Sequence, residues 1–190
     1  MSQTQTLAKH INGVPVNDLH ATIEAIKQTP AAAKFRFRVA NEWLEGARTQ
    51  SVAKSFYGTG QEHSHARPFV LESDEPPVLL GKDLAPGAGE YLLHTLAACM
   101  TGALIYHAAA RGIQIEEVES SIEGDIDLQG FLGIDPNVRK GFEAIRVNFK
   151  VKANVPEEEL NEVASLAPMF SPMFDSITRG VPISFSAERM

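Results

Sequence analysis

Residues 89–112 read GEYLLHTLAACMTGALIYHAAARG, the longest apolar stretch of the chain. The stretch predicts a helix over 90–111 that ends where Gly112 supplies a C-terminal cap. Because apolar residues cover nearly every face, we expect a buried central helix, enclosed by a sheet or by a partner subunit. Polar residues interrupt the stretch too often for a uniform transmembrane span: His94, Cys99, Thr101, His107 and Arg111.

The segments on either side of this helix carry both helical and strand patterns. A short amphipathic helix is expected over 17–28, with Asn17 as its N-cap and Pro30 as its stop. Apolar and polar residues alternate in the segments expected to be strands, which are 34–40, 48–57, 66–72, 114–128, 142–153 and 181–187. Two further helices are expected, one from Pro156 to about Ala167 and one from Ser171. This order predicts an α+β fold in which antiparallel strands wrap around the long helix.

Composition limits the class of protein and its partners. The 190 residues are enough for one domain with a substantial core, with or without an N-terminal attachment. The net charge of −7 and the absence of a Lys/Arg run argue against nucleic acid and against an anionic membrane as partners. A single cysteine and an N-terminal stretch without a continuous apolar segment are typical of a protein from the reducing cytoplasm.

The single cysteine, Cys99, is the first candidate for chemistry. A lone thiol cannot form an intramolecular disulfide, so redox chemistry at Cys99 would have to be completed by a molecule outside this chain. The alternative is a small core residue, because free cysteine is among the most buried residue types. His94 lies about 140° around the helix from Cys99, so it is a poor base for the thiol.

The histidine pair His63-Ser64-His65 is the only motif that suggests a metal. On a strand both rings would point to one face, which suits metal binding. Gly58 and Gly60 nearby favour a loop, however, and no cysteine or acid at a suitable distance completes a ligand set. We therefore expect neither a metal nor another cofactor.

Three blocks together resemble the OsmC/Ohr superfamily of osmotically induced and organic hydroperoxide resistance proteins. They are EYLLHTLAACMT at 90–101, YHAAARGI at 106–113 followed by VESSIEGD at 118–125, and SPMFDSI at 171–177. The resemblance covers roughly 34–187, which makes 34–190 an OsmC-like domain and 1–33 an N-terminal extension. It implies an intertwined homodimer with the two long helices packed in the middle.

The resemblance also implies a catalytic site. In this superfamily a cysteine on the long helix attacks the O–O bond of a hydroperoxide, beside an arginine from the strand region that a glutamate positions. Cys99 and Glu90 match the cysteine and the glutamate, although an acid in the first turn of a helix is favourable in any protein. Arg48 is the nearest match for the arginine, or else a solvated hairpin charge. The alternatives to Arg48 are Arg36, Arg38 and Arg67.

One departure from the superfamily pattern divides the functional hypotheses. Peroxidase members carry a second cysteine where this chain has Ser171, and a serine cannot resolve a sulfenic acid into a disulfide. One hypothesis is a one-cysteine peroxidase that reduces small organic hydroperoxides and is recycled by an external thiol. The other is a non-catalytic dimer that binds a small apolar molecule, with Cys99 structural or a redox sensor. A substrate pocket around Ser171 would be lined by Met169, Phe170 and Met173, which are otherwise core residues.

Overall fold

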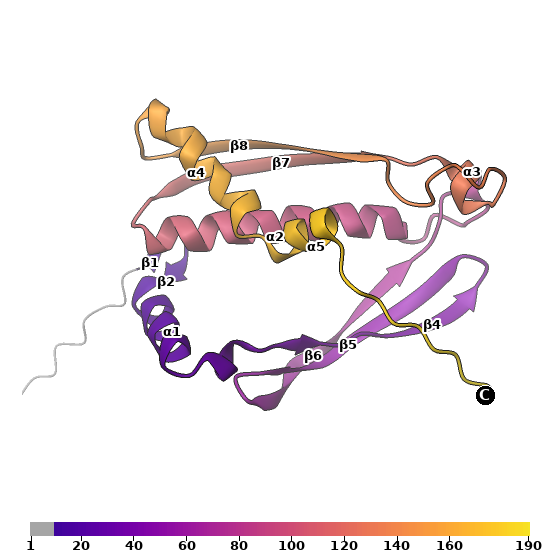
Figure 1. Cartoon of the computed structure of the whole chain (residues 1–190), viewed down its shortest axis with the longest axis horizontal. Helices are drawn as coiled ribbons and strands as arrows, with labels where there is room; N and C mark the ends of the chain where they lie inside the picture. The colour runs from indigo at the N-terminus through magenta and orange to yellow at the C-terminus, as the bar shows by residue number, and fades with distance from the viewer. Residues whose placement is uncertain (1–9) are drawn as a thin grey trace, which may run out of the picture. The chain divides into compact units, whose positions relative to one another are not determined.

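The computed structural model describes residues 10–190 and divides them into two compact units (Figure 1). The first unit is Pro15–Leu92, and the second is Leu93–Met190 together with residues 10–14. The long helix α2 (Ala88–Ala110) begins in the first unit and continues through the second. The expected α+β class is confirmed, and the predicted bounds of the long helix, 90–111, differ from those of α2 by two residues or fewer at either end.

The first unit is a four-stranded antiparallel sheet preceded by helix α1 (Val16–Gln28). Its strands are β3 (Arg36–Phe37), β4 (Ala40–Glu45), β5 (Arg48–Gly58) and β6 (Gln61–Ser73). β6 pairs along one edge of β5, while β3 and β4 pair with successive parts of its other edge. A short 3-10 turn (Pro77–Leu79) lies in the loop between β6 and α2.

The histidine pair lies on a strand, so the loop expected there is wrong. The turn between β5 and β6 is only Thr59-Gly60, and both residues adopt positive φ. His63 and His65 therefore share one face of β6, and each ring packs against Phe56. Among residues 10–190, no group of three or more His, Cys, Asp or Glu is placed to hold a metal ion.

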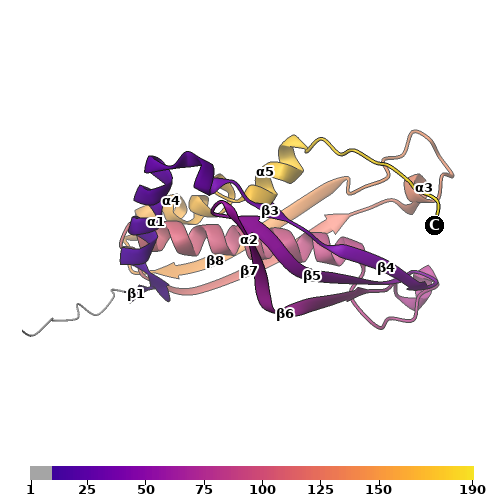
Figure 2. The same cartoon turned by 90° about the horizontal axis from the view of Figure 1, so that it is seen from below.

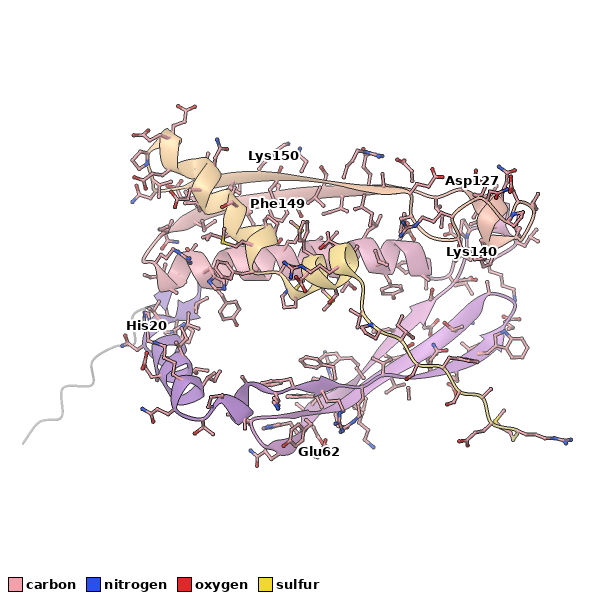
Figure 3. The ribbon with its side chains drawn as sticks, viewed as in Figure 1. His20, Glu62, Asp127, Lys140, Phe149 and Lys150 are labelled. Atoms are coloured by element: carbon pink, nitrogen blue, oxygen red, sulfur yellow. The ribbon has the colours of Figure 1, made fainter. Side chains whose placement is uncertain are left out.

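The second unit is built on α2 and the hairpin of β7 (Ile115–Asp125) and β8 (Ala144–Ala153). Alternation along β8 directs one face to the core: Figure 3 shows Phe149 pointing toward α2 and Lys150 pointing away. α4 (Glu157–Met169) completes the core through Val163, Leu166 and Ala167. The remaining helices are α3 (Leu128–Phe131), between the two strands, and α5 (Pro172–Arg179).

Helix α2 contributes a stripe of buried residues and a cap at its end. Leu96, Met100, Leu104 and Ala108 recur every fourth residue and are at most 3% exposed. At the C-terminus, Gly112 adopts φ +78°, and the amides of Gly112 and Ile113 bond the carbonyls of Ala109 and Ala108. This is the Schellman arrangement, and it confirms the predicted role of Gly112. α2 is also long and apolar enough to cross a membrane, a property that core helices share.

The first described residues form a hairpin that the sequence interpretation missed. β1 (His10–Ile11) and β2 (Val14–Pro15) flank Asn12-Gly13, and both turn residues have positive φ, as a tight hairpin turn requires. The Asn12 side chain donates to the carbonyl of Ile113 at 3.0 Å and accepts from the amide of Ile115 at 2.8 Å. The hairpin is thereby fixed to the start of β7.

Two local expectations are wrong. α1 begins at Val16 with Pro15 in the cap position, so Asn17 lies inside the helix and is not its N-cap. The strand expected over 181–187 is absent, and the chain after α5 runs as an extended trace (Figure 2). A strand exists only when its backbone pairs with another, and no strand of residues 10–190 pairs with this segment.

Candidate functional site

Cys99 lies in the middle of α2. It is free and half-buried, whereas Leu96 and Met100 on the same helix are each 3% exposed. By helical periodicity Cys99 is turned about 100° from Met100, which places it beside the buried stripe. Cys99 is therefore more exposed than the core residues Leu96 and Met100 of the same helix.

Ser171 is a helix cap. Its residue is 2% exposed, and its hydroxyl oxygen accepts the amide N–H of Phe174 at 3.2 Å, which satisfies one free donor of α5. Met173 and Phe174, in the first turn of α5, pack against the cluster that contains Leu96 and Met100. The start of α5 and the α2 stretch around Cys99 therefore contribute to one apolar cluster.

The three other residues expected to line a pocket with Ser171 lie in different environments. Met173 joins the apolar cluster, while Phe170 stacks on His107 with ring centroids 3.6 Å apart. Met169 is 65% exposed and lines a cavity of about 230 Å³ between α4 and the end of α2. Arg111, which also lines this cavity, follows Cys99 by a rise of about 18 Å along the helix. The cavity therefore lies away from the thiol.

The pair His107 and Arg111 was not predicted as a functional group. Arg111 donates to the carbonyl of His107 at 2.9 Å and lies over the ring of Phe170, 5.6 Å from its centroid. Burial, and then the nearby Arg111 charge, lower the pKa of His107 below its ordinary value. The stack of His107, Phe170 and Arg111 fixes the corner between α4 and α5 on α2.

Glu90 caps its own helix. It is the third residue of α2, and its carboxylate accepts the amide N–H of Gly87 at 2.8 Å. Cys99 lies nine positions after Glu90, so the two side chains point about 180° apart around the helix axis. The structure thus explains Glu90 as a capping residue, and the positioning role that the resemblance gives it stays a prediction.

Arg48, the first residue of β5, is paired with an acid of the neighbouring strand. Its Nη2 lies 2.7 Å from Oε2 of Glu72 and its Nε 3.3 Å from the same oxygen. Hydrogen bonding and charge attraction from Glu72 raise the pKa of Arg48 above its already high ordinary value, so the guanidinium is permanently charged. Tyr91, next to Glu90 on α2, donates its hydroxyl to the carbonyl of Glu72 at 2.6 Å.

The alternative arginines are less enclosed. Arg38 forms two hydrogen bonds to Glu62, at 2.7 and 2.8 Å, and its side chain is 40% exposed against 28% for Arg48. Arg36 and Arg67 are exposed on the same sheet. Arg48 is the most enclosed of the four cations.

Asp74 is a buried acid that the sequence interpretation did not single out. Only 2% exposed, it accepts the backbone amides of Glu75, Lys82 and Leu84 at 2.9, 3.1 and 3.2 Å. Burial alone would raise the pKa of Asp74, but these three N–H donors and the Arg48 charge outweigh burial and lower it. An acid directly before Pro-rich sequence was the available signal. Asp74 holds the loop between β6 and α2 in one conformation.

The α+β fold, whose long helix carries the half-buried Cys99, matches the fold of OsmC-like proteins. The family model for OsmC-like protein matches residues 81–186, more than half of the chain. The chain belongs to the OsmC-like family. No curated protein is similar enough to match it.

Solved structures with the same fold share little sequence with this chain. An OsmC-like protein from Mycoplasma pneumoniae is 16% identical with a TM-score of 0.56, over 77% of this chain and 89% of that one. An organic hydroperoxide resistance protein OsmC from Legionella pneumophila is 16% identical with a TM-score of 0.54, over 76% and 90%. A putative osmotic stress induced and detoxification response protein from Psychrobacter arcticus is 15% identical with a TM-score of 0.51, over 74% and 85%. These likenesses establish the fold.

Proposed function

We propose that this protein is a thiol-dependent redox protein that reduces organic hydroperoxides through Cys99 and is recycled by an external thiol. The observation that carries the proposal is the free, half-buried Cys99 on the central helix of an OsmC-like chain. The hydroperoxide resistance protein among the structural relatives supports the substrate class. We further propose a cytoplasmic location, where external thiols are abundant.

The proposed cycle needs one protein thiol and two equivalents of external thiol. The Cys99 thiolate attacks the terminal oxygen of the O–O bond, giving a sulfenic acid and an alkoxide that takes up a proton and leaves as an alcohol. A first external thiol condenses with the sulfenic acid, releasing water and forming a mixed disulfide. A second external thiol attacks this mixed disulfide, restoring the Cys99 thiol and releasing the disulfide of the reductant.

In this proposal Arg48 supplies the cation that favours the thiolate. Burial disfavours a thiolate, and a nearby permanent positive charge offsets that cost and orients the peroxide. The partial burial of Arg48, whose side chain is 28% exposed against 40% for Arg38, supports this choice among the candidate arginines.

The test follows Cys99 oxidation in the reduced protein by mass spectrometry as cumene hydroperoxide is added. We expect one oxygen atom to be taken up at Cys99, much faster than by an unactivated thiol at the same pH. Arg48→Ala should slow this uptake and raise the pH at which iodoacetamide alkylates Cys99. Arg38→Ala, which breaks the comparable Arg38–Glu62 pair, serves as the matched control and should leave both unchanged. Uptake at the rate of an unactivated thiol would refute the proposal.

A second candidate function is favoured by Ser171. Because its hydroxyl is used as a cap and supplies no resolving sulfur, the chain also suits an OsmC-like dimer that binds a small apolar molecule without turnover. In that case the protein would show no peroxide turnover with an external thiol, while a fluorescent apolar probe would still bind.

The assembly that we propose for either function is a homodimer with α2 at its centre. The apolar helix α2 leaves Ala98 and Tyr106 exposed on its surface. In the C-terminal segment, Ile183 and Phe185 are each 91% exposed. Ala98→Glu should therefore give a folded monomer by light scattering at micromolar concentration. Ala25→Glu, on an exposed face of α1, is the matched control and should leave the dimer intact. A wild-type monomer at that concentration would contradict the assembly.

A further inference from the structure

We propose that the cavity between α4 and the end of α2 is a binding site for a small aliphatic α-amino acid. All of its lining residues belong to the second unit, and its volume is about 230 Å³. This volume lies below the range of about 300–1,000 Å³ that is typical of pockets for drug-sized molecules, so it suits a ligand of amino-acid size. Arg111, which lines the cavity, follows Cys99 by a rise of about 18 Å along the helix, so binding there is independent of the proposed peroxide reduction.

One face of α4 gives the cavity an apolar floor and an acidic rim. Glu159, Glu162 and Leu166 follow one another at intervals of three and four residues, so they share one face of the helix. Leu166 is buried, and Ile113, in the loop between α2 and β7, supplies a second apolar wall. The two glutamates are exposed at the rim. A ligand in the cavity therefore meets aliphatic side chains below and carboxylates at one side.

Arg111 supplies a positive charge to the same cavity and is held in place. Its Nη1 donates to the carbonyl of His107 at 2.9 Å, and its guanidinium carbon lies 5.6 Å from the centroid of the Phe170 ring. Among residues 10–190, no group accepts a hydrogen bond from its Nε or Nη2. This free edge of the guanidinium can donate two parallel hydrogen bonds to a carboxylate.

The charges that line the cavity do not neutralise one another. Within the described part of the chain, Arg111 forms no ion pair, and the carboxylates of Glu159 and Glu162 accept no hydrogen bond. A dicarboxylate or a phosphate would be repelled by the two glutamates, and a diamine would be repelled by Arg111. A zwitterion satisfies both kinds of charge, since its carboxylate pairs with Arg111 and its ammonium group with the glutamates. An aliphatic side chain on this zwitterion would cover the apolar floor.

The experiment titrates the purified full-length protein with L-leucine and follows the backbone amide resonances by NMR. We expect saturable shifts at residues 111–113 and 159–169, with a dissociation constant of about 1 mM or lower for a ligand of this size. Two analogues test the need for both charges: 4-methylpentanoic acid lacks the ammonium group, and 3-methylbutylamine lacks the carboxylate. Each should bind at least about tenfold more weakly than leucine. The absence of a saturable shift with leucine, or equal binding of either analogue, would overturn the inference.

Two variants assign the charges to the two ends of the ligand. Glu162→Gln should weaken leucine binding about tenfold but should not weaken the binding of 4-methylpentanoic acid, which has no ammonium group. Arg111→Gln should weaken both of these ligands but not 3-methylbutylamine, which has no carboxylate. This selectivity separates a lost charge from a disturbed fold.

Matched controls lie on the same two C-terminal helices but outside the cavity. Glu158→Gln on α4 and Arg179→Gln on α5 remove exposed charges of the same types and should keep the wild-type affinity for leucine. Wild-type affinity in both Glu162→Gln and Arg111→Gln would place the bound leucine elsewhere and overturn the inference. Equal weakening of all three ligands in Glu162→Gln, or weakened leucine binding in the controls, would overturn it as well.

Discussion

Replacing Ser171 by cysteine restores the second sulfur of the superfamily pattern and tests the relation of α5 to Cys99. In the reduced state the substitution should destabilise the protein. The Ser171 hydroxyl accepts the Phe174 amide at 3.2 Å, and sulfur is a weak acceptor. Loss of an N-cap costs about 1 kcal/mol, which lowers Tm by about 2–4 °C in a domain of this size. Ser171→Ala removes the same cap without adding a thiol and should show the same loss.

After oxidation, the Ser171→Cys variant should instead be more stable than wild type. A bridge between residues 99 and 171 closes a loop of about 72 residues, which the chain-entropy estimate values at about 4 kcal/mol. Subtracting the lost cap leaves the oxidised variant about 3 kcal/mol more stable than wild type. The assay is thermal unfolding of the variant before and after treatment with cumene hydroperoxide, with the bridge counted by mass spectrometry without reductant. Dithiol-dependent peroxide turnover should appear in the variant, whereas wild type should accumulate sulfenic acid or a mixed disulfide.

The bridge is a strict geometric test because it requires Cβ atoms about 3.5–4.5 Å apart. A variant that keeps two free thiols after peroxide treatment would show that residue 171 does not face Cys99. The peroxidase geometry would then be wrong for this chain, and the apolar-binding function would be favoured. Ser171→Ala must stay unbridged and must not gain stability on oxidation.

Three further predictions concern the second unit. Leu104→Ala removes a fully buried side chain and should lower the free energy of unfolding in urea by about 2–5 kcal/mol. Leu80 is 94% exposed, so the control Leu80→Ala should change this free energy by less than about 0.5 kcal/mol. Asn12→Gly keeps the positive φ but leaves the amide of Ile115 without its hydrogen-bond partner. We expect this amide to lose hydrogen-exchange protection and the free energy of unfolding to fall by about 1–3 kcal/mol. Unchanged protection would contradict the anchoring of the hairpin to β7. The pKa of His107 is lowered in the folded state, so a proton binds this residue more readily in the unfolded chain, and the free energy of unfolding should fall as the pH drops below about 6.5. His107→Gln should flatten this pH dependence. An equal slope in both proteins would exclude His107 as its source.

Strong periodicity made most of the elements of this fold predictable from the sequence. Twenty or so residues without a polar face can only be a buried helix, and strict alternation in 142–153 can only place one face of a strand in the core. The Asn12-Gly13 turn was equally readable, since Asn-Gly between two apolar residues is a strong hairpin signal, but it was missed. The segment 181–187 shows the limit of periodicity, because alternation gives a segment the capacity to pair but not the partner.

The sequence by itself determined the family, the central helix and the one thiol available for chemistry, because these depend on residue type and short-range spacing. The tertiary structure alone decided the partners of the charged groups. Glu90 and Glu72 are alike as residues, yet one caps a helix and the other holds Arg48, since strand register brings together residues that are 24 positions apart in the chain. Ser171 is likewise a helix cap only because α5 begins at the next residue, Pro172. Long-range pairing follows from how the elements pack, which no local pattern encodes.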